Sequence, residues 1–441
     1  MGGTGGKTLF GEDLGGNERK AKRPSSGAPR VKRPDRRQSV LRPEVIDDLL
    51  PPDHRARAIV AAIEKLDLSA FYEPIKSRGT DPGRPATDPQ MLVALWLFAI
   101  SEGVGSGRQL ERLCERDDAY RWICGGVQVN YHTLTDFRVD HGRALDDLLT
   151  QLLGALMHEG LVKLQRVAQD GMRVRASAGA ASFHRIRSLR KCIAAAKEQV
   201  KRAKAMLDKD DPTRSDKARV ARERAARQRE DRVTKALAEL KKLQASAKSK
   251  EDAEGTRVST TDPDARVMRM PGGGHRPAYN VQLATDTESN VIVGVGVTNV
   301  GSDRSQLSPM LDDVVRRTGK LPDDWLADGG FVNFGSIQEA GEQGVDVFAP
   351  PQSAKVTDPL EPRPTDPEHV AAWRRRMGSR KGKEVYKQRA ATAERVNADL
   401  RAHRGFDQLP VRGIDKALMV SLWMALTYNI LTWISASPPV A

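Results

Sequence analysis

Residues 386–401 read YKQRAATAERVNADLR, a run of good helix formers that contains neither Gly nor Pro. We therefore expect a single helix across this stretch. It carries one carboxylate framed by a tyrosine and two arginines, namely Glu394, Tyr386, Arg389 and Arg401. Residues three and four apart share a helix face, so Asn397 flanks the carboxylate. This framing favours a functional surface, and the alternative is a solvated helix with scattered charges.

Two aspartates upstream stand in matching contexts. Asp170 lies in LQRVAQDGMRVRASA, and Asp328 lies in DDWLADGGFVNFG. Each follows a strand-like apolar run and precedes a glycine, so we expect each to lie at or near the end of a buried strand. An ionised aspartate is rarely buried unless it is paired or binds a metal. A turn residue is the alternative for either one alone. Two such aspartates and one helical glutamate form a more specific set.

The charge of the chain points to a polyanionic partner. The 441 residues include 72 Lys and Arg against 58 Asp and Glu, which leaves a net charge of +14 and a pI near 9.7. This balance favours nucleic acid, with a membrane surface as the competing polyanion. The length allows two or three domains.

The cysteine pattern and the apolar segments indicate neither a zinc site nor a membrane span. Its three cysteines form no CxxC motif, so they indicate no zinc site and fit a reducing cytoplasm. The first residues contain no apolar segment of the signal-peptide type. Residues 417–434 are the most apolar, but they include several polar side chains, so we expect a buried core helix there.

Composition divides the chain into four parts. Residues 1–42 are rich in Gly, Lys, Arg and Pro and are expected to form a disordered basic arm. Residues 43–160 show helical patterns broken by Gly turns, which suits an all-α DNA-binding domain, with an ordinary helical subdomain as the alternative that the pattern leaves open. Residues 161–436 form the third part. Residues 184–250, the fourth, lie within it, and their pattern predicts two long polar helices that form an inserted antiparallel hairpin. The hairpin could clamp DNA, mediate dimers or be a solvated coiled-coil insertion.

The third part alternates strand and helix signals. Three strand-like segments are followed by helix, strand, helix, strand and helix, with residues 352–382 as a Pro- and Arg-rich loop. This order predicts a mixed α/β sheet of the RNase H kind. In such a sheet Asp170, Asp328 and Glu394 can converge at one edge.

Several segments resemble one family, the bacterial insertion-sequence DDE transposases. GRPATDPQMLVALWLFAISEGVGSGRQLERLCERDDAYRWICGG is similar to the family's N-terminal domain. TTDPDARVMRMPGGGHRPAYNVQLATD, WLADGGF and YKQRAATAERVNADLRAHRGFDQLPVRG are similar to its catalytic domain. The resemblance covers roughly residues 84–434 without the helical insertion, and the motifs occur in the family's order.

The resemblance assigns roles to individual residues. It implies that Asp170, Asp328 and Glu394 are the catalytic, metal-binding carboxylates. A Tyr-Arg-Glu-Lys signature of related transposases falls on Glu394 and on three residues expected to contact DNA: Tyr386, Arg389 and Arg401. The interval between Arg389 and Glu394 is one residue longer than in that signature, and Arg401 replaces its lysine. Phe331 stands where tyrosine is common.

The implied activity is DNA cleavage and joining with two Mg²⁺ ions, for which Mn²⁺ can substitute. Carboxylate oxygens are the ligands that these hard cations prefer. Water would free a 3′-OH at each end of the element, and that 3′-OH would attack target DNA. The expected partners are double-stranded terminal inverted repeats and target DNA, with a homodimer or larger assembly in the synaptic complex and no membrane. The expected location is the bacterial cytoplasm, associated with the nucleoid when DNA is bound.

Two other functions fit the same residues. One is an RNase H-like nuclease with the same metal site but without strand transfer. The other is a domesticated, catalytically silent DNA-binding protein, against which the three intact carboxylates argue.

Overall fold

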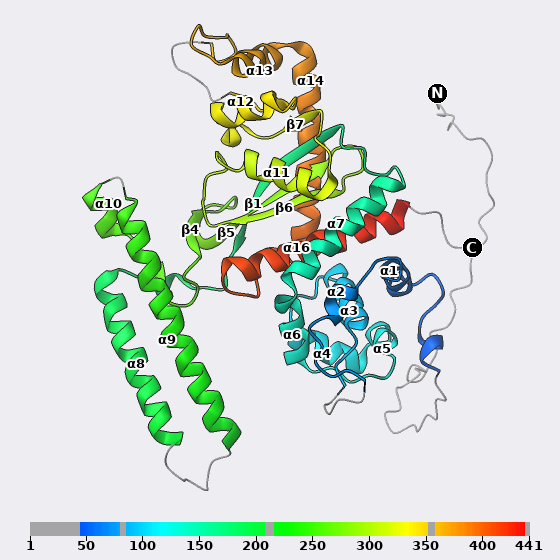
Figure 1. Ribbon diagram of the computed structural model, residues 1–441, viewed down its shortest axis with the longest axis vertical. Helices are drawn as coiled ribbons and strands as arrows, with labels where there is room; N and C mark the ends of the chain where they lie inside the picture. The colour runs from blue at the N-terminus through cyan, green and yellow to red at the C-terminus, as the bar shows by residue number, and fades with distance from the viewer. Residues whose placement is uncertain (1–44, 80–84, 208–215, 248, 352–357, 437–441) are drawn as a thin grey trace, which may run out of the picture. The chain divides into compact units, whose positions relative to one another are not determined.

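The fold is taken from a computed structural model, which describes residues 45–79, 85–207, 216–247, 249–351 and 358–436. The basic arm expected over residues 1–42 lies outside the described residues. All described residues belong to one compact unit. Its centre is a mixed sheet, built where the sequence predicts one (Figure 1).

The sheet is organised around its longest buried pairing, between β1 and β5. β5 runs antiparallel to β1, with Asp170 opposite Leu283. On the other side of β1, β7 and then β8 continue the sheet in parallel. β4 and β6 both pair with the far edge of β5. The strands are β1 (Arg166–Arg175), β4 (Arg266–Arg269), β5 (His275–Asp286), β6 (Ile292–Thr298), β7 (Asp324–Leu326) and β8 (Asp346–Phe348). Each of the two short parallel strands begins with an aspartate and continues with two buried apolar residues, as parallel strands are usually buried.

Helices cover the sheet. α11 (Leu307–Thr318) packs on β6, and α12 (Phe334–Glu342) packs on β8. The sequence predicts a helix from about residue 302, but the structure begins α11 at Leu307. The difference arises because the side chain of Asp303 does not cap the helix; it accepts hydrogen bonds from buried side chains of β5.

The prediction of a loop over residues 352–382 is wrong for the second half of that stretch. α13 (Glu368–Gly378) and the first residues of α14 (Arg380–Arg389) lie there. Three apolar side chains at helical spacing, Val370, Trp373 and Met377, are buried on one face of α13. The indole Nε1 of Trp373 donates to the carbonyl oxygen of Ala349 at 3.0 Å. Tertiary packing therefore stabilises a helix in an arginine-rich stretch, and one of its arginines, Arg374, is itself buried.

The helix expected over residues 386–401 is present, with one irregularity. α14 continues into a π-helical turn, η4 (Ala390–Glu394), and then into α15 (Arg395–Ala402). Thr392 and Ala393 of the turn are buried, and the turn contacts β1 and β5.

Two long helices lie within the segment 184–250. α8 (Ile186–Leu207) packs side by side with α9 (Asp216–Ala245), and the short α10 (Lys250–Gly255) follows (Figure 1). A two-stranded ribbon of β2 (Phe183–His184) and β3 (Val258–Ser259) closes the insertion at its base. The small apolar core of the hairpin consists of Leu189, Val233, Ala236, Leu240 and Val258.

Residues 45–158 are helical. Asp88 caps α3 through a hydrogen bond from the Gln90 amide at 3.0 Å, with Pro89 as first helical residue, as the sequence predicts. The helices are η1 (Ile46–Leu49), α1 (Arg55–Ile63), α2 (Ser69–Tyr72), α3 (Pro89–Ser101), α4 (Gly107–Arg116), α5 (Asp118–Cys124), α6 (Tyr131–Asp140) and α7 (Gly142–His158).

The last helix, α16 (Ile414–Ala436), joins these helices to the sheet. The indole Nε1 of Trp423 donates to the carbonyl oxygen of Arg138 in α6 at 3.1 Å. On the sheet side, Asn429 bonds both backbone groups of Ile292, at 2.8 and 2.7 Å. α16 is the one described helix long and apolar enough to cross a membrane, and 67% of that apolar window is buried inside the protein. The buried core helix expected from the sequence is therefore observed.

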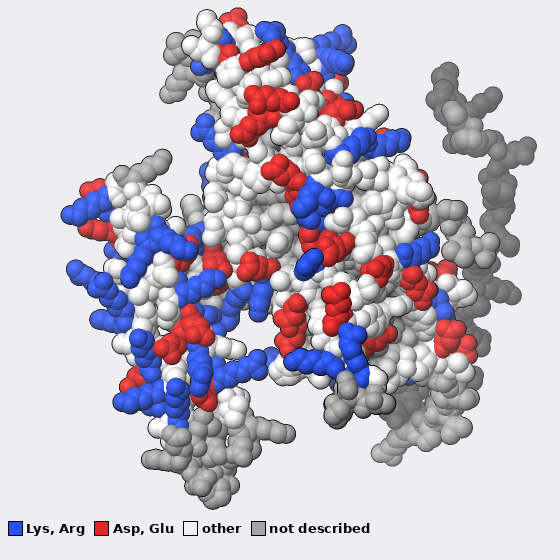
Figure 2. All heavy atoms as spheres, viewed as in Figure 1, with Lys and Arg blue, Asp and Glu red and all other residues white. Residues whose placement is uncertain are grey.

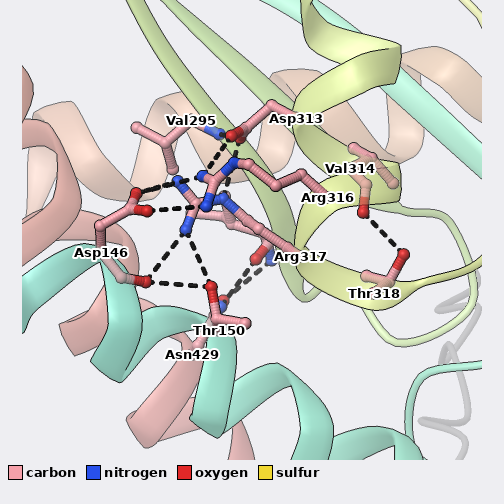
Figure 3. A network of polar contacts seen from close by, with 10 residues as sticks. Asp146, Thr150, Val295, Asp313, Val314, Arg316, Arg317, Thr318 and Asn429 are labelled. Carbon is pink, nitrogen blue, oxygen red and sulfur yellow. Dashed lines mark hydrogen bonds and ion pairs between the residues drawn. The ribbon is translucent and has the colours of Figure 1, made fainter. Parts of the chain in front are cut away.

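A second junction ties α7 to α11 through charge. The Arg317 side chain, only 1% exposed, lies between Asp146 of α7 at 2.5 Å and Asp313 of its own helix at 2.9 Å (Figure 3). Arg316 contacts the same two carboxylates at 2.8 and 2.7 Å. Asp313 also accepts a hydrogen bond from the backbone amide of Val295 in β6 at 3.0 Å. Helical region and sheet thus share one packed body.

The strand that carries Asp170 does not end there. β1 continues through Gly171 to Arg175, so the expected strand end at this aspartate is wrong. Gly171 is required for packing and not for a turn. A Cβ atom at this position would lie 2.4 Å from Oδ1 of Asp303 and 2.6 Å from Nε2 of Gln282.

We therefore predict that Gly171→Ala destabilises the protein by about 1–3 kcal/mol, because the added methyl group overpacks this buried polar cluster. Urea unfolding of the full chain measures the change. Gly154→Ala is the matched control, since Gly154 lies exposed in α7 and a methyl group added there would meet no other atom within 4 Å. The control should be stabilised by up to about 1 kcal/mol. Equal stabilities of the two variants would contradict the packing role of Gly171.

Candidate active site

The three carboxylates singled out in the sequence lie around one guanidinium group. Nη2 of Arg389 is 2.9 Å from Oδ1 of Asp170 and 3.9 Å from Oδ2 of Asp328. Its Nη1 is 3.9 Å from Oε1 of Glu394. β1, the end of β7 and the helix of residues 380–402 each supply one carboxylate. Segments more than 200 residues apart in sequence thus meet at one cation.

A second arginine ties the same three elements together. Arg166, the first residue of β1, contacts Asp324 of β7 at 2.5 Å. Its Nη1 donates to Oε1 of Gln388 in α14 at 2.7 Å. The strand pairing and this bridge fix the helix against the sheet, so the three carboxylates approach one another.

The π-helical turn explains how Arg389 and Glu394 can share this site. They are five residues apart, which in a regular α-helix would rotate one well away from the other. A π-helical turn widens the helix by one residue and brings residues five apart closer to one face. The interval that is one residue longer than the Tyr-Arg-Glu-Lys signature coincides with this turn. The turn therefore accommodates the additional residue.

Asp170 is the most enclosed of the three carboxylates. Asn397 donates from Nδ2 to its Oδ2 at 2.7 Å, while Arg389 holds its Oδ1. Burial raises the pKa of Asp170, Arg389 opposes this shift, and the neighbouring Asp328 adds to it. Because the folded pKa lies above the unfolded value, the ionised carboxylate costs stability at neutral pH. That cost fades as pH falls through the folded pKa.

Asp328 and Glu394 face solvent. Asp328 is the second residue after β7, near a strand end as expected, and accepts a hydrogen bond from the Gly330 amide at 2.7 Å. Its side chain is 42% exposed, and that of Glu394 is 66% exposed. Phe331 is fully buried beside them. A ligand could thus reach two of the three carboxylates directly.

The other residues of the signature lie on the same helix. Tyr386 is half-buried next to Arg389, and burial raises the pKa of its hydroxyl. Arg401 is half-buried two turns beyond Glu394, where its Nη2 donates to the carbonyl oxygen of Arg173 in β1 at 3.4 Å. Arg389 is 11% exposed and turned inward. It is therefore less open to a large ligand than the sequence suggests.

The sequence interpretation missed a polar cluster on the opposite face of β1. Oδ1 of Asp303 accepts hydrogen bonds from Asn280 at 2.6 Å and from Gln282 at 2.7 Å. Its Oδ2 contacts Arg173 at 3.1 Å, and Gln169 donates to Gln282 at 3.0 Å. The signal in the sequence was alternation, since Gln169 and Arg173 of β1, and Asn280 and Gln282 of β5, lie on one face of their strands. The cluster supports the strand behind Asp170.

The three carboxylates are the kind of ligand that hard cations prefer, but they do not lie close enough together to coordinate one. Carboxylate oxygens suit Mg²⁺ or Mn²⁺. Within the described ranges, no group of three or more Asp, Glu, His or Cys side chains is close enough to hold a metal ion. The guanidinium of Arg389 lies among them instead. The donor set fits a divalent cation provided that Arg389 gives way.

Comparisons with known proteins place two segments of the chain in transposase families. A scan of family models matches residues 44–140 to a family described as "Transposase domain (DUF772)" and residues 252–430 to one described as "Transposase DDE domain". The second match includes Asp328 and Glu394, whereas Asp170 lies outside both. No curated protein and no solved structure matches the chain.

We predict that Arg389→Ala destabilises the protein in the presence of a chelator by about 3 kcal/mol, because a mostly buried carboxylate loses its partner. The same change should tighten Mn²⁺ binding, since a competing cation is removed from the carboxylates. Thermal unfolding in EDTA and titration with Mn²⁺ followed by electron paramagnetic resonance measure the two effects.

The control is Arg380→Ala, at an exposed position in the first turn of the same helix. It should change neither quantity. If Arg389→Ala leaves both the melting temperature and the Mn²⁺ affinity unchanged, the guanidinium does not balance the charge of the three carboxylates.

Proposed function

Because the chain belongs to the insertion-sequence DDE transposases, we propose that it binds the ends of its element, hydrolyses phosphodiester bonds there and joins the freed 3′-OH to target DNA. The observation that carries this proposal is the meeting of Asp170, Asp328 and Glu394 around one guanidinium. The sheet order supports an RNase H-like fold for the catalytic part: three antiparallel strands, then two parallel ones on the other side of β1.

Asp170, Asp328 and Glu394 are the residues that would hold Mg²⁺. When bound, two such ions would activate the attacking oxygen and stabilise the leaving oxygen. The protein's own contribution is orientation. Asn397 fixes one oxygen of Asp170, and the Gly330 amide fixes one oxygen of Asp328. Two of the three carboxylates are therefore held before DNA arrives.

Three cationic or polar residues of the helix would hold the DNA backbone. Tyr386 and Arg401 flank the carboxylates on the same helix. Arg389 would exchange its carboxylates for a phosphate once a divalent cation takes them, because its guanidinium then loses its anionic partners. Arginine suits this role since its planar fork matches carboxylate and phosphate alike.

The helical region would read the ends of the element. Its match to a transposase domain family supports this assignment, and the packing of α16 keeps it attached to the sheet. Two ends must be held together for joining, so we propose that at least two copies of the chain assemble on DNA. The site of action would be the bacterial nucleoid.

Asp170→Asn, Asp328→Asn and Glu394→Gln should each reduce metal-dependent cleavage of end DNA by at least about 10³-fold and leave end binding within about threefold. The reason is that each change removes a metal ligand without removing a cation that meets DNA. Cleavage of labelled duplex and binding by fluorescence anisotropy measure the two effects.

Glu384→Gln is the control, because Glu384 is exposed on the same helix and pairs only with Lys387 among the described residues. It should cleave normally. If one of the three carboxylate variants keeps near-normal cleavage, the residue changed in it is not a metal ligand. Products nicked but never joined would favour the RNase H-like nuclease.

Arg401 provides a separate prediction about DNA. Arg401→Lys should be nearly silent, since it restores the usual residue of the signature and keeps the charge. Arg401→Ala should weaken end binding or cleavage about tenfold while the melting temperature stays within a degree or two. Its one hydrogen bond to a described residue is the long one to the Arg173 carbonyl oxygen. Loss of several degrees with normal cleavage would show a structural role instead.

A further inference from the structure

The positive charge of the chain is concentrated in the helical hairpin. α8 and α9 together contain 17 Lys and Arg against 6 Asp and Glu, a net charge of +11. The whole chain carries +14. Figure 2 shows these side chains gathered over the two helices. Such a density is costly in self-repulsion, and a polyanionic partner would relieve it.

The hairpin offers little to an apolar partner. Its buried face is already occupied by the core of Leu189, Val233, Ala236, Leu240 and Val258. Among the described side chains of α8 and α9, Val220 is the one exposed large hydrophobic residue. Dimerisation through a coiled coil needs a continuous apolar seam. The described surface lacks one, which argues against the dimer alternative.

One flank of α8 carries positive charge without any acid. Arg190, Lys197, Lys201 and Lys204 are spaced by seven, four and three residues, so they lie along one flank. All four are exposed, and none forms an ion pair with a described residue. Glu198, the one acid of α8, pairs with Arg202 at 3.2 Å. The flank spans about 21 Å at 1.5 Å per residue.

The base of the hairpin is fastened to the catalytic sheet. Lys235 contacts Asp264 at 2.8 Å, and Arg266 at the start of β4 contacts Glu239 at 2.6 Å. Asp262 accepts a hydrogen bond from the hydroxyl of Tyr279 in β5 at 2.7 Å. The charged helices are therefore part of the same body as the active site and not a separately tethered tail.

We propose that the α8–α9 hairpin is a sequence-independent contact surface for the phosphate backbone of duplex DNA, with the flank of Arg190, Lys197, Lys201 and Lys204 as its centre. This inference rests on the proposed function for the identity of the polyanion. The flank is as long as about six base-pair steps of 3.4 Å, so several phosphates can meet it together. These four cations have no acidic partner among the described residues, so they would give up no ion pair with that part of the chain on binding phosphate.

The experiment compares two triple variants of the full chain that remove equal charge. Lys197→Gln, Lys201→Gln and Lys204→Gln neutralise three of the four cations of the flank. Arg202→Gln, Arg227→Gln and Lys242→Gln, the control, neutralise three cations of the same hairpin that already pair with Glu198, Glu223 and Glu239. Glutamine is a good helix former, so both variants should keep the hairpin, which circular dichroism checks.

Binding of a 40-base-pair duplex of arbitrary sequence is measured by anisotropy in EDTA over a range of salt concentrations. The flank variant should bind about tenfold or more weakly at 100 mM salt. In a plot of log K against log salt concentration, the magnitude of the slope should fall by about two to three, since each phosphate contact contributes roughly 0.9 to it. The control should change affinity less than about threefold.

Three outcomes would overturn the proposal: equal losses in both variants, no loss in either, or tighter binding of wild type to phosphatidylserine vesicles than to duplex. The first would indicate diffuse charge, the second a solvated insertion, and the third a membrane surface. Because binding is measured without metal or cleavage, failure here leaves the transposase assignment intact. Loss of the transposase assignment would instead appear in the carboxylate variants.

Discussion

The site depends on one cation held where three anions would otherwise repel one another. Without Arg389, Asp170 would be a mostly buried carboxylate beside a second carboxylate, and burial and Asp328 already raise its pKa. Fixing three acids in place before any ligand binds requires a countercharge, and the helix supplies one from within the protein. The sheet and the helix can therefore pack against each other at this site because Arg389, followed by the π-helical turn, balances the charge of the three carboxylates.

Much of this arrangement can be predicted from the sequence, because local patterns determine it. Apart from β4, which was not predicted, the order of strands and helices in the sheet follows from apolar periodicity, and the cap at Asp88 follows from its neighbour Pro89. The three carboxylates come from motif positions, and the structure brings them together. Their metal and DNA roles remain predictions.

What the sequence did not reveal depends on long-range packing. Asp170-Gly171 looks like a turn, yet the strand continues because Gly171 admits Asp303 and Gln282 against β1. The Arg-rich stretch before residue 380 looks like a loop, yet Trp373 and its neighbours find a buried surface on β8 and α12. The inward direction of Arg389 has the same origin. Composition cannot show which of several arginines faces its own protein and which faces solvent.

The position of α16 has a consequence for synthesis. Its Trp423 bonds to Arg138 of α6 across 285 residues, and its Asn429 joins β6. The N-terminal helices emerge from the ribosome long before the helix that covers their apolar faces. Until the last residues are made, Phe137 and its neighbours lack that cover, a state prone to aggregation or to chaperone binding. A polypeptide released before residue 394 would hold neither a finished core nor Glu394, so it would lack one carboxylate of the proposed site as well as the helix that covers its N-terminal part.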